Sequence, residues 1–83
     1  MMKPGLPHTV RLRIDSFTKA VRLAGFRSDY ALARAMGIHR STVIRVSRGI
    51  LHPGPAFIAG TLVALAPMQF DDLFEVVPLH RAQ

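Results

Sequence analysis

Two segments near the ends of the chain have the hydrophobic pattern of short β-strands. In residues 9–14, Val10, Leu12 and Ile14 alternate with arginines, and this period of two predicts a strand. Residues 74–77 (Phe-Glu-Val-Val) are β-prone and end before a proline. A sheet of these two segments would be marginal alone and would need helices beneath it. It could also form between two chains by exchange of strands.

Between these segments, the apolar residues recur at helical spacing. A first helix is expected to begin with Asp15 or Ser16 as its cap and to run to about Ala24. A later helix begins at Pro55, ends before Pro67 and is expected to be buried on most sides. A one-turn helix is expected at residues 70–74, with two acids at its positive end. The inner side of the first helix would consist of Phe17, Ala20, Val21 and Ala24.

Residues 28–49 have the pattern of two short helices joined by a tight turn. Ser28 is a good N-cap for the first of them, and Gly37 can end it in the left-handed conformation. Gly49 gives the same signal at the end of the second helix, over residues 39–48. The expected inward residues of the first helix are Leu32, Ala33 and Met36.

The second of these helices has two opposed sides when its residues are placed at about 100° per residue. A helix with arginines outward and β-branched residues inward can enter a major groove, where arginine pairs with guanine and serine with either base type. The outward residues are Arg40, Ser41, Ile44, Arg45 and Arg48, and the inward residues are Val43, Val46, Ser47 and Ile50.

This stretch resembles the helix-turn-helix domain of the phage-repressor and Cro class, over about residues 9–77. The residues that match are Ala33, Gly37, Ile38, Val43, Val46 and Gly49. The resemblance implies a mainly α, five-helix domain with a possible two-stranded antiparallel sheet from its ends. It also implies a homodimer that binds an inverted repeat in double-stranded DNA and acts as a transcription regulator, most often as a repressor. Asp29 stands where many members have a phosphate-binding glutamine.

Within this hypothesis the polar residues of the motif divide into two groups. Base contacts set sequence preference, and phosphate contacts set register and affinity. Ile44 replaces the more usual small polar residue, so a thymine methyl group is its expected contact. The expected base-reading residues are Arg40, Ser41, Ile44 and Arg45. The expected phosphate contacts are Arg27, Arg34, His39, Thr42 and Arg48.

Composition supports a partner with negative charge. The chain has 83 residues and a net charge of +6, which fits one domain (1–83) with a core at about 9–77 and mobile ends at 1–8 and 79–83. Residues 27–48 contain five arginines and one acid, so much of the excess charge lies on the motif.

Other chemistry has little support in the sequence. The chain has no cysteine, and its four histidines show no metal spacing, so we expect no enzyme activity, no metal, no cofactor and no small-molecule ligand. Residues 49–70 lack charge, but their helix is too short to cross a membrane. No signal peptide is visible, and the expected location is the bacterial cytoplasm.

Two alternatives remain open at this stage. An antitoxin or another partner-binding protein could keep a helix-turn-helix body and use residues 49–70 for its partner. A non-specific nucleic-acid binder would need only the basic charge. The apolar helix could be monomer core, or a homodimer contact could involve this helix or the segments after it.

Overall fold

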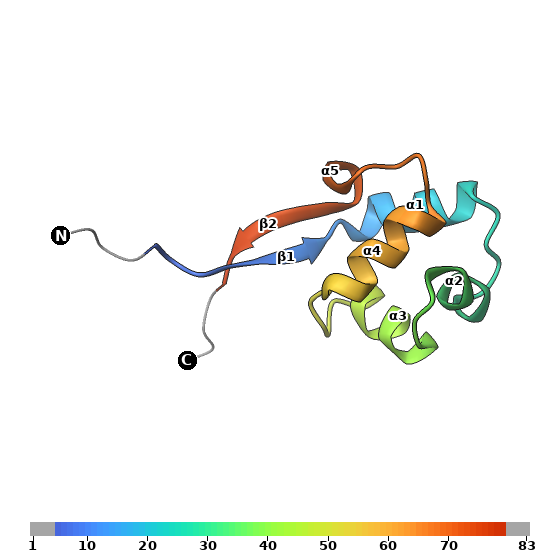
Figure 1. The fold of residues 1–83 in the computed structure, drawn as a ribbon, viewed down its shortest axis with the longest axis horizontal. Helices are drawn as coiled ribbons and strands as arrows, with labels where there is room; N and C mark the ends of the chain where they lie inside the picture. Colours follow the sequence, from blue (N-terminus) through green and yellow to red (C-terminus); the bar gives the residue numbers. More distant parts are fainter. Residues whose placement is uncertain (1–4, 80–83) are drawn as a thin grey trace.

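The computed structural model describes residues 5–79, and Figure 1 shows a body of helices from which a two-stranded arm extends. The fold is mainly helical with a small antiparallel sheet, as the sequence predicts. In chain order the elements are β1 (His8–Leu12), α1 (Ile14–Leu23), α2 (Asp29–Met36), α3 (Arg40–Ser47), α4 (Pro55–Ala64), α5 (Phe70–Leu73) and β2 (Phe74–Pro78).

The arm consists of β1 and β2, which pair antiparallel within the chain. The register places Val10 opposite Val76 and Leu12 opposite Phe74, and the last two residues are buried in the core. The limits of β1 differ from the prediction because Ile14 belongs to α1 and His8 belongs to the strand. Residues 1–8 and 79–83 are predicted to be mobile. Of these, residues 1–4 and 80–83 lie outside the described part of the chain.

The start of α1 corrects the predicted cap. Arg13 is the N-cap residue, without a side-chain cap bond, so neither Asp15 nor Ser16 has that role. The reason is non-local, because the Arg13 backbone N–H donates to the Leu73 carbonyl oxygen at 2.8 Å. This bond holds the chain beside β2 and lets the helix begin immediately afterwards.

The core lies where α1, α2, α3, α4 and the near end of the arm meet. The ring centroid of Phe57 on α4 lies 5.8 Å from that of Phe17 and 6.3 Å from that of Phe74, which joins three separate parts of the chain. The buried apolar residues are Leu12, Phe17, Ala20, Leu32, Ala33, Met36, Val43, Val46, Phe57, Leu65, Leu73 and Phe74.

Three expectations about burial are wrong. Ala24 is exposed because α1 ends at Leu23. Ile50 is 71% exposed because α3 ends at Ser47, so helical spacing no longer directs Ile50 inward. The later helix ends at Ala64 rather than near residue 66, and α4 is buried on one side only, since Ala56, Ala59 and Val63 are exposed.

Gly60 permits a close approach between α4 and α2. A Cβ atom at Gly60 would overlap the carbonyl oxygen of Met36, and it would lie 3.0 Å from the Cβ atom of Met36. Any side chain there would therefore push the two helices apart.

We predict that Gly60→Ala lowers the free energy of unfolding by about 1–3 kcal/mol, because overpacking outweighs the higher helix propensity of alanine. Urea denaturation measures the effect. Gly54→Ala is the control, since an added methyl group at Gly54 meets nothing within 4 Å. Equal stability of the two variants would contradict the close contact.

Thr61 on α4 is fully buried, and its hydroxyl oxygen has no hydrogen-bond partner within the described residues. We predict that the similarly shaped Thr61→Val raises the free energy of unfolding by about 1–2 kcal/mol, because it removes the cost of burying an unpaired hydroxyl group. Thermal and urea denaturation check this. Thr18→Val, at an exposed position of α1, should change stability by less than about 0.5 kcal/mol. A destabilised Thr61→Val protein would contradict the prediction.

Candidate nucleic-acid interface

Both helices of the predicted motif form, and α3 (Arg40–Ser47) is one residue shorter at each end than the predicted 39–48. The hydroxyl oxygen of Ser28 accepts a hydrogen bond from the Ala31 backbone N–H at 3.0 Å and caps α2. Gly37 ends α2 with φ of 71°, in the left-handed region. His39 then caps α3. The turn between the helices is short because only Ile38 separates the left-handed Gly37 from the capping His39.

The two sides of α3 differ in burial as the sequence predicts. Val43 and Val46 are buried against the core. On the other side Arg40, Arg45 and Arg48 are exposed, Ser41 is exposed and Ile44 is half-buried. Arg48 lies at the C-cap of α3, where its backbone N–H donates to the Ile44 carbonyl oxygen. The helix is therefore anchored by its valines and presents its arginines to solvent.

A local hydrogen-bond arrangement fixes the first turn of α3. The Ser41 backbone N–H donates to the His39 ring nitrogen Nδ1 at 3.4 Å. The Ser41 hydroxyl oxygen lies 3.0 Å from the same nitrogen and can donate to it. The hydroxyl oxygen keeps free lone pairs, so Ser41 is best suited to accept a hydrogen bond from a partner.

A groove of about 410 Å³ lies between α2 and the start of α3. It brings together Arg34, His39 and Arg40 from the predicted set, and Ile38 and Ala33 form part of its apolar lining. An arginine beside an imidazole ring on an open concave surface suits a phosphate group, and Arg40 lines the groove where it meets the exposed side of α3.

Tyr30 also lines this groove, and the sequence analysis did not single it out. Its side chain is 57% exposed. The signal was present, because Tyr30 and Arg34 are four residues apart on one helix and such residues share a face. A phenolic hydroxyl group can donate to a phosphate oxygen.

Three of the predicted phosphate contacts, Arg27, Thr42 and Arg48, lie outside this groove. Arg27 lies before α2 and lines a separate depression with Ser28 and Asp29, so it belongs to the N-terminal end of α2. Thr42 is half-buried on α3, and its backbone N–H donates to the His39 carbonyl oxygen. The structure therefore groups Arg34, His39 and Arg40 and leaves Arg27, Thr42 and Arg48 outside the groove.

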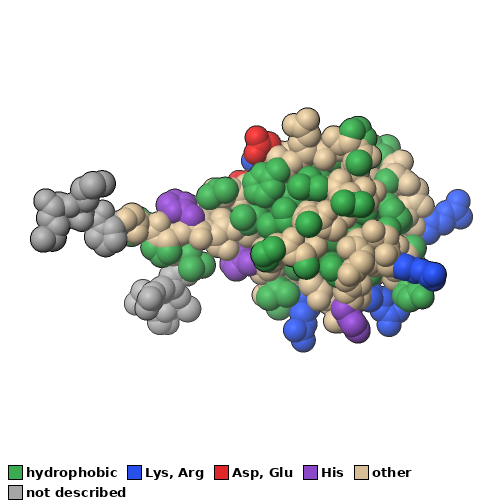
Figure 2. Space-filling view, viewed as in Figure 1, with side chains coloured by type: hydrophobic (Ala, Val, Ile, Leu, Met, Phe, Trp, Pro, Cys, Tyr) green, Lys and Arg blue, Asp and Glu red, His purple; other side chains and the backbone are tan. Residues whose placement is uncertain are grey.

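The charges are segregated over the surface. Among residues 5–79 the ion pairs are those of Arg11 and Arg13 with Glu75, at 2.7 and 3.7 Å. The hydrogen bond from Arg11 holds the pKa of Glu75 below its usual value. The five arginines of residues 27–48 have no carboxylate partner in this part of the chain. In Figure 2, Lys and Arg side chains gather on the side of α2 and α3, and acidic side chains lie near α5.

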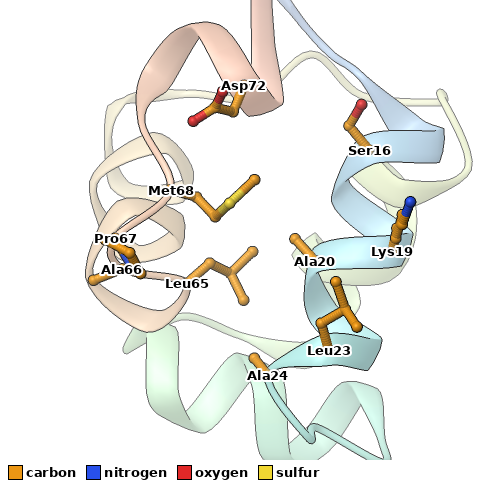
Figure 3. Close-up of a pocket in the computed structure, with 10 residues that line it drawn as sticks. All are labelled: Ser16, Lys19, Ala20, Leu23, Ala24, Leu65, Ala66, Pro67, Met68 and Asp72. Carbon is orange, nitrogen blue, oxygen red and sulfur yellow. The ribbon is translucent and has the colours of Figure 1, made fainter.

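A second cavity, of about 510 Å³, lies between α1 and the turn from α4 to α5. Figure 3 shows Leu65 and Met68 directed toward Ala20 across it, with Asp72 and Lys19 at its rim. Asp72 is already engaged, since its carboxylate accepts a hydrogen bond from the Gln69 backbone N–H at 2.8 Å. This carboxylate caps α5, at the end of the helix where the sequence places two acids.

Within residues 5–79, no cluster of His, Asp or Glu is arranged to hold a metal ion, and no helix is long and apolar enough to cross a membrane. Comparison of the chain with protein-family models, with curated proteins and with solved structures gave no match. The case for a function therefore depends on the geometry and charge of α2 and α3.

Proposed function

We propose that this chain binds double-stranded DNA with sequence preference and regulates transcription by occupying its site, most simply as a repressor in the bacterial cytoplasm. The observation that carries the proposal is the exposed side of α3. Its arginines are unpaired within residues 5–79 and extend from a helix whose other side is buried. Unneutralised arginines on a protruding helix suit the guanine edges and phosphates of a major groove.

The first turn of α3 and the position of Arg45 assign the base contacts. In helix-turn-helix proteins, residues near the N-terminal end of the second helix contact base edges. Arg40 and Arg45 would pair with guanine, and the Ser41 hydroxyl oxygen would accept from an amino group of a base. Ile44 keeps enough exposed surface to contact a thymine methyl group.

The remaining polar residues would contact the backbone. The groove lined by Tyr30, Arg34 and His39 would hold one phosphate beside α3. Arg27 at the start of α2 and Arg48 at the end of α3 would contact phosphates on either side, and the half-buried Thr42 is a weaker contact. Such contacts supply affinity and orientation without sequence information.

The proposed functional form is a homodimer. One α3 helix reads only a few base pairs, and a two-fold pair of such helices reads an inverted repeat whose half-sites lie about one helical turn apart. Selection of bound duplexes from a random library, at near-physiological salt, tests the proposal. An enriched inverted repeat supports it. Binding without enrichment and with steep salt dependence overturns it and indicates an electrostatic binder.

We predict that Arg45→Ala costs about 1–3 kcal/mol of binding free energy on the selected site and relaxes base preference at one position. On random duplexes the loss should be smaller. Competition binding measures both quantities. Lys19→Ala is the charge-matched control, because Lys19 lies on α1 beside the turn from α4 to α5 and should leave base preference unchanged. Equal losses on selected and random DNA would remove Arg45 from the base-reading set.

We predict a different pattern for Arg34→Ala. Because Arg34 lines the proposed phosphate groove, its loss should weaken selected and random duplexes by the same factor. The slope of log K against log salt should fall by about one. Titrations at several salt concentrations measure the slope. An unchanged slope, or a change in base preference, would contradict the phosphate assignment.

A further inference from the structure

The arm has surface that the helical body does not cover. Figure 1 shows β1 and β2 extending beyond the helices, and within the two strands only Leu12 and Phe74 are buried. Val76 is 61% exposed and lies opposite Val10, which is half-buried. A ribbon of two strands is marginally stable in water. The outer part of the arm would therefore gain stability from pairing with a further strand and from burial of its exposed side chains.

The hydrogen bonds at the two ends of the arm determine which backbone groups face outward. Arg13 N–H donates to the Leu73 oxygen, and Leu79 N–H donates to the Pro7 oxygen. In an antiparallel ladder, bonded and non-bonded pairs alternate. The odd-numbered residues of β1 therefore bond with β2, whereas His8 and Val10 direct their N–H and C=O groups away from it.

The two edges of the arm differ in their capacity to accept another strand. On β2, the Phe74 N–H already donates to the Phe70 oxygen, the Phe74 oxygen accepts from Arg13 at 3.2 Å, and Pro78 has no N–H. Proline and charged side chains normally protect an edge strand from further pairing. On β1, residues 8–10 contain no proline and no Lys, Arg, Asp or Glu. The open edge is therefore that of β1.

We propose that the β1 edge pairs antiparallel with β1 of a second copy of this chain, centred on Thr9. This proposal rests on the proposed function in one respect: the paired arms would be the contact surface of the proposed homodimer. His8 of each copy pairs with Val10 of the other through two backbone hydrogen bonds. The product is a four-stranded sheet with β2 at both outer edges. On those edges Val76 keeps its outward backbone groups, but Pro78 and the bonded Phe74 on either side of it prevent a longer ladder, so the assembly stops at two copies.

Burial and charge select this register over its neighbours. In a register centred on Val10, the backbone of Leu12 would have to form hydrogen bonds with the second copy, but Leu12 is only 4% exposed. Centring the pair on Arg11 would place two guanidinium groups directly opposite each other, which is destabilising. Centring it on Thr9 places two threonines opposite each other, a favourable cross-strand pair. On the other face, His8, Val10, Val76 and Pro78 of both copies form one surface without acidic or Lys and Arg side chains.

The closing experiment uses the fact that the chain has no cysteine. Opposite residues of a non-bonded antiparallel pair have Cα atoms about 4.5 Å apart, within the range that a disulfide spans. Thr9→Cys should therefore form covalent dimers under mild oxidation, without DNA. Thr18→Cys, at an exposed site on α1, is the control and should stay largely monomeric on denaturing gels. Equal cross-linking of both variants would overturn the proposal.

A second pair of variants tests the edge itself. Val10→Pro removes the N–H that faces the second copy and leaves the bonds between β1 and β2 in place, so the dissociation constant of the dimer should rise about tenfold or more. Val76→Pro, at the opposed position of β2, should leave association unchanged. Light scattering measures association, and circular dichroism checks the fold. A monomeric wild-type protein, or equal association of the two variants, would overturn the proposal.

These measurements separate the arm from DNA binding. A protein that selects a DNA sequence but does not cross-link at Thr9→Cys would overturn the arm pairing and leave the proposed function intact. A protein that cross-links at Thr9→Cys but shows no sequence preference would support the arm pairing and overturn the proposed function.

Discussion

The contact between Gly60 of α4 and the carbonyl group of Met36 determines where α3 can lie. Met36 is the last residue of α2, and the chain turns at Gly37 and enters α3 after His39. Because the turn between the two helices has so few residues, the distance between α2 and α4 also fixes the position of the start of α3. The buried valines of α3 then pack against the same core. The helix that we propose for DNA recognition is thus positioned by a contact between two backbones.

Charge separates the two parts of the molecule that contact partners in the proposed dimer. The cations of the arm, Arg11 and Arg13, are paired with Glu75, whereas those of α2 and α3 have no carboxylate partner among the described residues. Two bodies with unneutralised arginines repel each other. Association through the nearly neutral arm avoids this repulsion, and binding of a polyanion by α2 and α3 relieves it.

Local rules were sufficient for the motif and insufficient for its surroundings. The Ser28 cap, the left-handed Gly37 and the buried side of α3 follow from residue type and spacing, and the structure confirms them. The predicted cap of α1 was wrong because the Arg13 backbone is held by a hydrogen bond to Leu73, a residue sixty positions away in the sequence. The predicted burial of Ile50 was wrong because the helical periodicity was extended beyond the end of α3. The spacing of Tyr30 and Arg34 places them on one face of α2, but the groove that they line depends on the angle between two helices, which no single-helix pattern contains.

The arm and the core share Leu12 and Phe74, and this sharing has a consequence for how two copies could read DNA. The Phe74 ring lies edge-on to Phe57 and is stacked on Phe70, so the root of the arm is packed into the body rather than joined by a flexible linker. In a four-stranded sheet centred on Thr9, each body is held at a fixed distance from the two-fold axis. The separation of the two α3 helices would then be set by the length of the arm, and the spacing of half-sites by the number of residues between Thr9 and the core.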